Sequence, residues 1–180
     1  GSRKLWADES MDDWDSFSYT VQSDGEITFN WEFYHDDTSI IGTNCVYVDN
    51  VNYVSSGSTE PEPTATPEPT ATPEPTSAPA MTLEEAMNAP GCTLEYWNES
   101  DYPWIVTELD GRLVGMSNYT DESDHYNVSN VTATVNAKAG DVISFDYFLC
   151  VERFYDDFKF YVNGSRKLWA DESMDDWDSF

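Results

Sequence analysis

The chain has 180 residues, with 35 acidic residues against eight basic ones and a formal net charge of −27. Such a charge repels nucleic acid and anionic lipid, so we expect no nucleic-acid partner. No stretch approaches the roughly 20 apolar residues of a membrane-spanning helix, so we also expect no membrane insertion in this segment. Aromatic residues make up 15% of the chain, which favours a β-rich fold because aromatic side chains pack well on a pleated surface.

The first segment, residues 1–54, contains a strand pattern of period two. In "EITFNWEF" the residues Ile27, Phe29, Trp31 and Phe33 share one face, as expected for a strand with one buried side. The dipeptide Asp24-Gly25 separates this stretch from "FSYTVQ". Since Asp-Gly favours two-residue turns, it predicts a β-hairpin between the two stretches.

The next segment, residues 55–80, is a linker that reads "SSGSTEPEPTATPEPTATPEPTSAPA" and holds seven of the nine prolines of the chain. Repeated proline predicts an extended polyproline-II spacer. Its evenly spaced threonines are candidates for O-glycosylation, and a bare Pro/Thr/Glu spacer is the alternative. These threonines are Thr64, Thr66, Thr70, Thr72 and Thr76.

After the linker, "MTLEEAMNAPG" predicts a short helix over 83–88, with Thr82 as N-cap and Glu85 at the capping-box position. The stretches that follow alternate again, notably 131–137, 143–149 and 158–162. Many short alternating strands predict an all-β fold, an antiparallel β-sandwich with one short helix at the start of each unit.

Residues 164–180 repeat residues 1–17 letter for letter, with a period of 163 residues. Asn163-Gly164 predicts a hairpin turn, and Gly1 is the copy of Gly164, so the chain begins inside a turn. We therefore expect a window on a tandem array. Residues 1–54 are the C-terminal part of one repeat, and 81–180 are the N-terminal part of the next. Segment 81–163 should complete the sheets of 1–54, in the same polypeptide or by exchange with a neighbour, and 164–180 should occupy the hairpin position in preference to 1–17.

Several stretches resemble a known family: "GDVISFDY", "ERFYDDFKFYVNG", "WEFYHD" and "GTNCVYVDNV". Together they resemble the MAM-like and choice-of-anchor J (cleaved-adhesin-like) jelly rolls of bacterial surface proteins. The resemblance implies a jelly-roll sandwich that is repeated outside the cell. It also implies adhesion or glycan contact, and often structural Ca²⁺.

The resemblance places candidate calcium ligands at Asp49, Glu152 and Asp156, because these carboxylates fall within the similar stretches. Ca²⁺ takes six to eight oxygen ligands, which acidic loops supply. A jelly roll would also make Cys45 and Cys150 neighbours, so a disulfide between them is one expectation. Buried thiols acting as small hydrophobic side chains are the other.

No catalytic motif surrounds either histidine, His35 or His125, so we expect no enzyme. The function we expect is that of a structural repeat in an extracellular surface fibre, stalk or adhesin, with neighbouring copies of the repeat as partners. The alternative is a carbohydrate-binding module of a secreted multidomain enzyme that contacts glycans through exposed aromatic residues. Candidate aromatic platforms are Trp6, Trp14, Trp97 and Trp104, and packing in the core is the alternative use that we expect for most of them.

Overall fold

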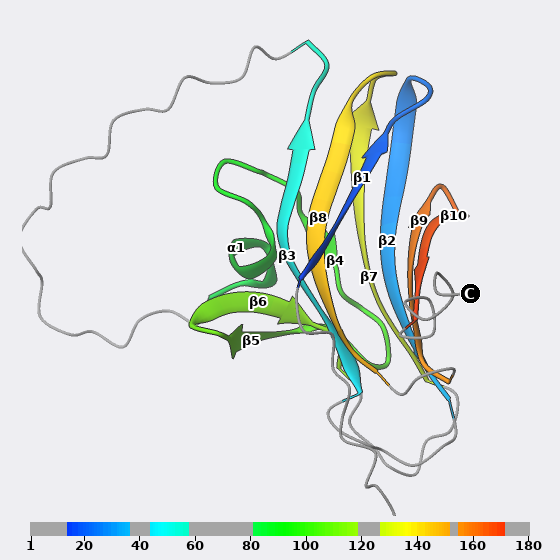
Figure 1. Ribbon diagram of the computed structural model, residues 1–180. Helices are drawn as coiled ribbons and strands as arrows, with labels where there is room; N and C mark the ends of the chain where they lie inside the picture. The colour runs from blue at the N-terminus through cyan, green and yellow to red at the C-terminus, as the bar shows by residue number, and fades with distance from the viewer. Residues whose placement is uncertain (1–13, 37–43, 58–80, 119–126, 152–154, 172–180) are drawn as a thin grey trace, which may run out of the picture.

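The computed structural model describes residues 14–36, 44–57, 81–118, 127–151 and 155–171 (Figure 1). Three strands precede the linker: β1 (Asp15–Thr20), β2 (Gly25–His35) and β3 (Cys45–Val54). The helix α1 (Leu83–Met87) follows it, and then come β4 (Tyr96–Trp97), β5 (Ile105–Leu109), β6 (Arg112–Met116), β7 (Asn127–Ala137), β8 (Val142–Cys150), β9 (Asp157–Val162) and β10 (Ser165–Ala170).

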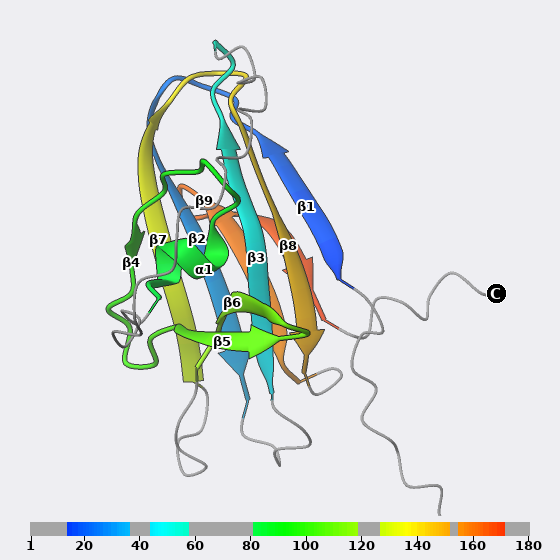
Figure 2. The same ribbon diagram turned by 90° about the vertical axis from the view of Figure 1, so that its left-hand side faces the viewer.

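The strands form two five-stranded antiparallel sheets that face one another, which confirms the predicted β-sandwich (Figure 2). Sheet A has the order β1-β8-β3-β6-β5, and sheet B has the order β10-β9-β2-β7-β4. In sheet A, β8 lies between β1 and β3, and in sheet B, β2 lies between β9 and β7. Each sheet therefore interleaves strands from the two sides of the linker.

The core between the sheets follows the alternation predicted from the sequence. Trp31 of β2 is fully buried, and its ring centroid lies 5.1 Å from that of Phe160 of β9. Phe145 of β8, in the other sheet, approaches the same Phe160 ring to 4.9 Å in an edge-on contact. Burial of each large apolar side chain contributes about 1.5–3 kcal/mol, so these aromatic residues stabilise the packing of one sheet on the other.

The predicted helix is confirmed as α1, and it begins with the expected capping box. The Thr82 hydroxyl accepts the N–H of Glu85, and the Glu85 carboxylate accepts the N–H of Thr82 at 2.9 Å. Met87, at the end of the helix, is buried against Gly115 of β6, where an added Cβ would meet the Met87 side chain at 2.4 Å. In the described part of the chain, no helix is long and apolar enough to cross a membrane.

Two similar turn sequences have different outcomes. Asn163 and Gly164 both have positive φ angles, 48° and 71°, and they join β9 to β10 in the predicted hairpin. The hairpin predicted at Asp24-Gly25 is wrong, because β1 belongs to sheet A and β2 to sheet B. The chain crosses between the sheets here because of Val21, which is buried. Val21 exchanges backbone hydrogen bonds with residues 140 and 141 in the β7–β8 turn. These bonds fix the chain where it crosses from one sheet to the other.

Candidate functional site

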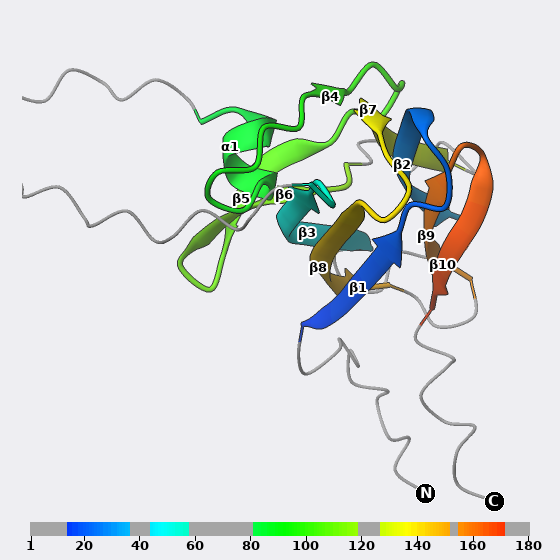
Figure 3. The same cartoon turned by 90° about the horizontal axis from the view of Figure 1, so that it is seen from above.

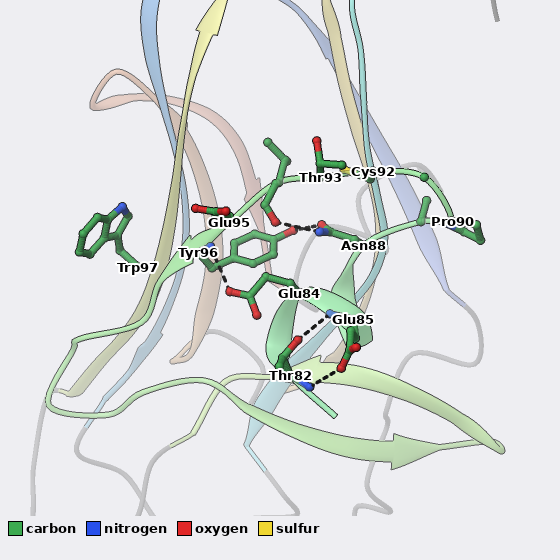
Figure 4. A pocket seen from close by; sticks show the side chains of 13 residues that line it. Thr82, Glu84, Glu85, Asn88, Pro90, Cys92, Thr93, Glu95, Tyr96 and Trp97 are labelled. Carbon is green, nitrogen blue, oxygen red and sulfur yellow. Dashed lines mark hydrogen bonds between the residues drawn. The ribbon is translucent and has the colours of Figure 1, made fainter. Parts of the chain in front are cut away.

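An open hollow of about 780 Å³ lies beside α1, between the helix and the chain that leads to β4 (Figure 4). It is lined by residues 82, 84, 85 and 88–97, which include three glutamates, Tyr96 and Trp97. Polar and aromatic side chains line this hollow together, so it is a candidate ligand site if its polar groups are available to a ligand.

The polar groups at the centre of the hollow satisfy one another. The Tyr96 hydroxyl donates to the Asn88 side-chain oxygen, and the Asn88 amide donates to the Leu94 carbonyl at 2.8 Å. Burial raises the pKa of Tyr96 far above its usual range, and the nearby Cys92 and Glu84 groups raise it further. The phenol therefore stays a neutral donor, and this network holds β4 in place.

Trp97 is the exception, because its side chain points away from Tyr96 and out of the hollow (Figure 4). It is 63% exposed, the largest value among the exposed large hydrophobic residues of the described ranges. In the register of sheet B, Trp97 of β4 lies opposite Thr132 of β7, and Thr132 lies opposite Asn30 of β2. Asn30 in turn lies opposite Tyr161 of β9. These four residues alternate with core positions, so they form a row across the outer face of sheet B.

The other predicted aromatic platforms are used differently. Trp104 is 2% exposed and belongs to the core. Trp14 packs against Phe148 and lies under the Arg112 guanidinium, 4.6 Å from its ring centroid. Trp6 lies outside the described residues, as do the five threonines of the linker proposed for O-glycosylation.

Asp49, the first predicted calcium ligand, lies on β3 and faces Arg112, with 3.2 Å between its carboxylate and the guanidinium. Its other oxygen accepts the N–H of Asn50 at 2.6 Å. Burial raises the pKa of Asp49, while the Asn50 N–H and the Arg112 charge oppose the rise. Its carboxylate is thus engaged within sheet A.

Asp156, another predicted ligand, directly precedes β9 in sheet B, so the structure does not bring it together with Asp49 on β3. Asp156 is 1% exposed, and its oxygen accepts from the His35 ring at 2.8 Å and from the Asp36 N–H at 3.1 Å. Glu152 lies outside the described residues. The calcium site stays a prediction.

His35, Asp36 and Asp156 form a group that the sequence analysis did not identify as a unit. Each offers one ligand atom, and these atoms lie within 4.8 Å of one another. One imidazole with two carboxylates suits a transition metal better than Ca²⁺, which prefers six to eight oxygens. His35 occupies the inward position after Phe33, so the strand pattern predicts its burial but not its partner.

A second buried carboxylate, Asp141, was missed by the sequence analysis. It is 2% exposed and accepts from the Tyr53 hydroxyl at 2.5 Å, from the Ser56 N–H at 2.6 Å and from the Lys138 N–H at 2.8 Å. These donors, Tyr53 first, hold the pKa of Asp141 well below its usual range. Because Ser56 lies at the start of the linker, Asp141 fixes the point where the linker leaves the sandwich.

The two cysteines of the predicted disulfide lie opposite one another. Cys45 begins β3, Cys150 ends β8, and they are direct partners in the register of sheet A. The structure holds both as thiols.

No protein-family model, no curated protein and no solved structure matches this chain.

Proposed function

We propose that this chain is a repeating unit of an extracellular bacterial surface fibre, stalk or adhesin, in which jelly-roll domains are joined by Pro/Thr-rich spacers. The observation that carries the proposal is the interleaving of strands from both sides of the linker in both sheets. A domain of this kind is complete only when segment 81–163 meets a segment equivalent to 1–54, which the 163-residue period supplies. The partners in this proposal are therefore neighbouring copies of the repeat.

The end of β10 and the start of β1 lie where one continuous chain could join them. In that order, segment 81–163 runs directly into the next copy of segment 1–54. Ala170, the last residue of β10, pairs with Phe158 of β9. The Phe158 ring lies 5.4 Å from the ring of Tyr147 on β8, and Tyr147 pairs with Asp15, the first residue of β1. Seen from above, the end of β10 and the start of β1 both lie toward the same side of the sandwich (Figure 3). In the sequence the copy of Asp15 lies eight positions after Ala170. Eight residues span up to about 28 Å, so one chain can join these strands and close the same sandwich.

The role that follows is mechanical. Antiparallel strands in two facing sheets must separate together when the domain is pulled, while a proline-rich spacer sets the distance between domains. Completion within one polypeptide is the default, because contiguous segments lose little entropy on docking. Exchange between neighbouring chains would instead produce a filament with shared domains.

A pulling experiment on a chain of three or more periods tests this proposal. We expect equal unfolding steps from a domain of 137 residues, which is the 163-residue period less the 26-residue linker. In reducing buffer, each step should add about 45–50 nm of contour length before the folded dimension is subtracted. Irregular steps, or a single step for the whole chain, would contradict an array of independent domains.

Carbohydrate binding is the second candidate, and the exposure of Trp97 favours it. An exposed indole offers an apolar face on which a sugar ring stacks, and the neighbouring Thr132 and Asn30 offer hydrogen bonds to sugar hydroxyls.

A glycan array with two matched variants tests this candidate. Trp97→Ala should abolish any specific signal. Trp169→Ala should keep it, because the Trp169 indole donates to Asp157 and lies under Arg166. No signal for the wild type, or equal loss in both variants, would exclude Trp97 as a platform.

A further inference from the structure

We propose that Cys45 and Cys150 form a disulfide that links β3 to β8 and thereby joins the segments on the two sides of the linker covalently. The bond itself depends only on the register of β3 and β8. Its role as a covalent closure of each repeat rests on the proposed function.

The register supplies the geometry. Directly opposed residues of an antiparallel pair have Cα atoms about 4.5 or 5.5 Å apart, depending on the hydrogen-bonding pattern. A disulfide requires Cα atoms about 4.4–6.8 Å apart. Cys45 and Cys150 are direct partners, so the bond needs no shift of either strand.

The two thiols also share one environment. Cys45 is 2% exposed and forms a small cluster with Tyr47 and Val114 on the outer side of sheet A. Cys150, with Phe148, packs against this same cluster and is only partly buried. Opposed side chains of a ladder point to the same face, and the partial exposure of Cys150 gives an oxidant access to its sulfur.

The third cysteine, Cys92, does not compete for either partner. Its N–H bonds to the carbonyl of Ala89, and the N–H of Ala89 bonds to the carbonyl of Val51. Val51 lies six residues along β3 from Cys45, a distance of about 20 Å in a strand. Cys92 is therefore far beyond the reach of a disulfide to Cys45, and one pairing of the three is favoured.

The chemistry is a two-electron oxidation by thiol–disulfide exchange. The Cys150 thiolate attacks an oxidised low-molecular-weight or enzyme disulfide, which releases one thiol and leaves a mixed disulfide on Cys150. The Cys45 thiolate then attacks the Cys150 sulfur and releases the second thiol. The oxidant gains two electrons and two protons, and the protein loses the same number. Extracellular surroundings supply such oxidants and preserve the product.

In the continuous order of the array, the copy of Cys45 follows Cys150 by 58 positions, given the 163-residue period. The bond would close a loop of that length within every domain. Under tension the enclosed residues cannot extend, so the bond limits how far each domain lengthens. If neighbouring chains exchange segments, the same bond becomes a covalent cross-link between them.

Oxidised glutathione, as the oxidant, tests the bond on the full 180-residue chain. We expect a non-reducing peptide map to show a Cys45–Cys150 peptide pair and an alkylated Cys92. Reduction should lower the Tm by about 5–15 °C. Cys92→Ser should keep this shift, and Cys150→Ser should lose it. Quantitative alkylation of Cys45 and Cys150 in the oxidised, folded protein would overturn the proposal, and so would a bond to Cys92.

Pulling on a chain of several repeats tests the disulfide and the tandem array independently. With the bond, oxidised domains should give steps about 20 nm shorter than reduced domains. Equal steps in both conditions would overturn the bond and leave the array intact. Irregular steps in reducing buffer would contradict the array, and the peptide map would still decide the bond.

Discussion

The two ends of the sandwich differ, although each contains a fully buried aspartate. At the end where the linker leaves, Asp141 accepts from Tyr53 and from two backbone N–H groups, and every one of these contacts fixes the scaffold. At the opposite end Asp156 pairs with an imidazole, His35, and sheet A carries two opposed thiols. An imidazole can ligate a metal ion, and a pair of thiols can be oxidised. The linker end therefore holds contacts within the scaffold, and the opposite end holds the groups with metal-binding or redox chemistry.

The largest effect should come from Asp141→Ala. It leaves the partly buried Tyr53 hydroxyl and two N–H groups without their acceptor, so we expect a loss of about 2–3 kcal/mol in the free energy of unfolding. Urea unfolding measures it. Asp24→Ala is the matched control, since Asp24 accepts one exposed bond from Ala139 in the same region and should cost about 0.5–1 kcal/mol. Equal losses would remove the special role of Asp141.

The stability that the Asp141 carboxylate contributes should depend on pH. Its pKa is lowered in the folded state, so the ionised form stabilises the protein above the ordinary aspartate pKa of about 3.9. We expect the stability difference between wild type and Asp141→Asn to stay constant from pH 8 to about 5 and to shrink as the pH falls below about 4. A difference that grows on acidification would contradict the assigned direction.

At the opposite end, Asp156→Asn should cost less, about 1–2 kcal/mol, because the amide keeps an oxygen acceptor for His35 and for the Asp36 N–H. Thermal melting with Ca²⁺ and with a chelator belongs to the same experiment. If the predicted structural calcium binds here, it raises the Tm of the wild type more than that of the variant. A Tm unchanged by calcium would argue against that site, and a loss equal to that of Asp141→Ala would make the two ends equivalent.

The smallest effect should come from Ser56→Ala, below about 0.5 kcal/mol. The Ser56 side chain lies 3.5 Å from the Ala139 carbonyl and is exposed, whereas its backbone N–H donates to Asp141 at 2.6 Å. Ser56→Pro removes that N–H and should cost about 1–3 kcal/mol. If the alanine variant were the more damaging one in urea unfolding, the side chain and not the backbone would anchor the linker.

Local patterns in the sequence predicted much of the fold. The alternation of Phe29, Trp31 and Phe33 identified a core strand, and the capping box at Thr82 identified α1, because both signals act within one element. The turn at Asp24-Gly25 failed for the opposite reason. Its outcome depends on Val21, whose backbone partners lie about 120 residues away in the β7–β8 turn.

The candidate sites were harder to predict for the same physical reason. Asp141 binds Ser56 and Tyr53, which lie 85 and 88 positions away from it, and Asp156 meets His35 across 121 positions. No local motif encodes such pairs in a single sequence. Cys45 and Cys150 were paired by way of a family resemblance, and the register of β3 and β8 now gives that pairing a geometric basis.

To test whether the domain is completed across the linker, the chain is cut within residues 58–80 at an introduced protease site. The size of the product is then measured by size-exclusion chromatography with light scattering. Because strands from both sides interleave in both sheets, the two pieces should co-elute as one folded particle and separate only in denaturant. Each piece isolated in this way should be unfolded by circular dichroism and should regain the β signal on mixing. Pieces that separate in native buffer, one of them with its own cooperative melting transition, would contradict a domain completed across the linker.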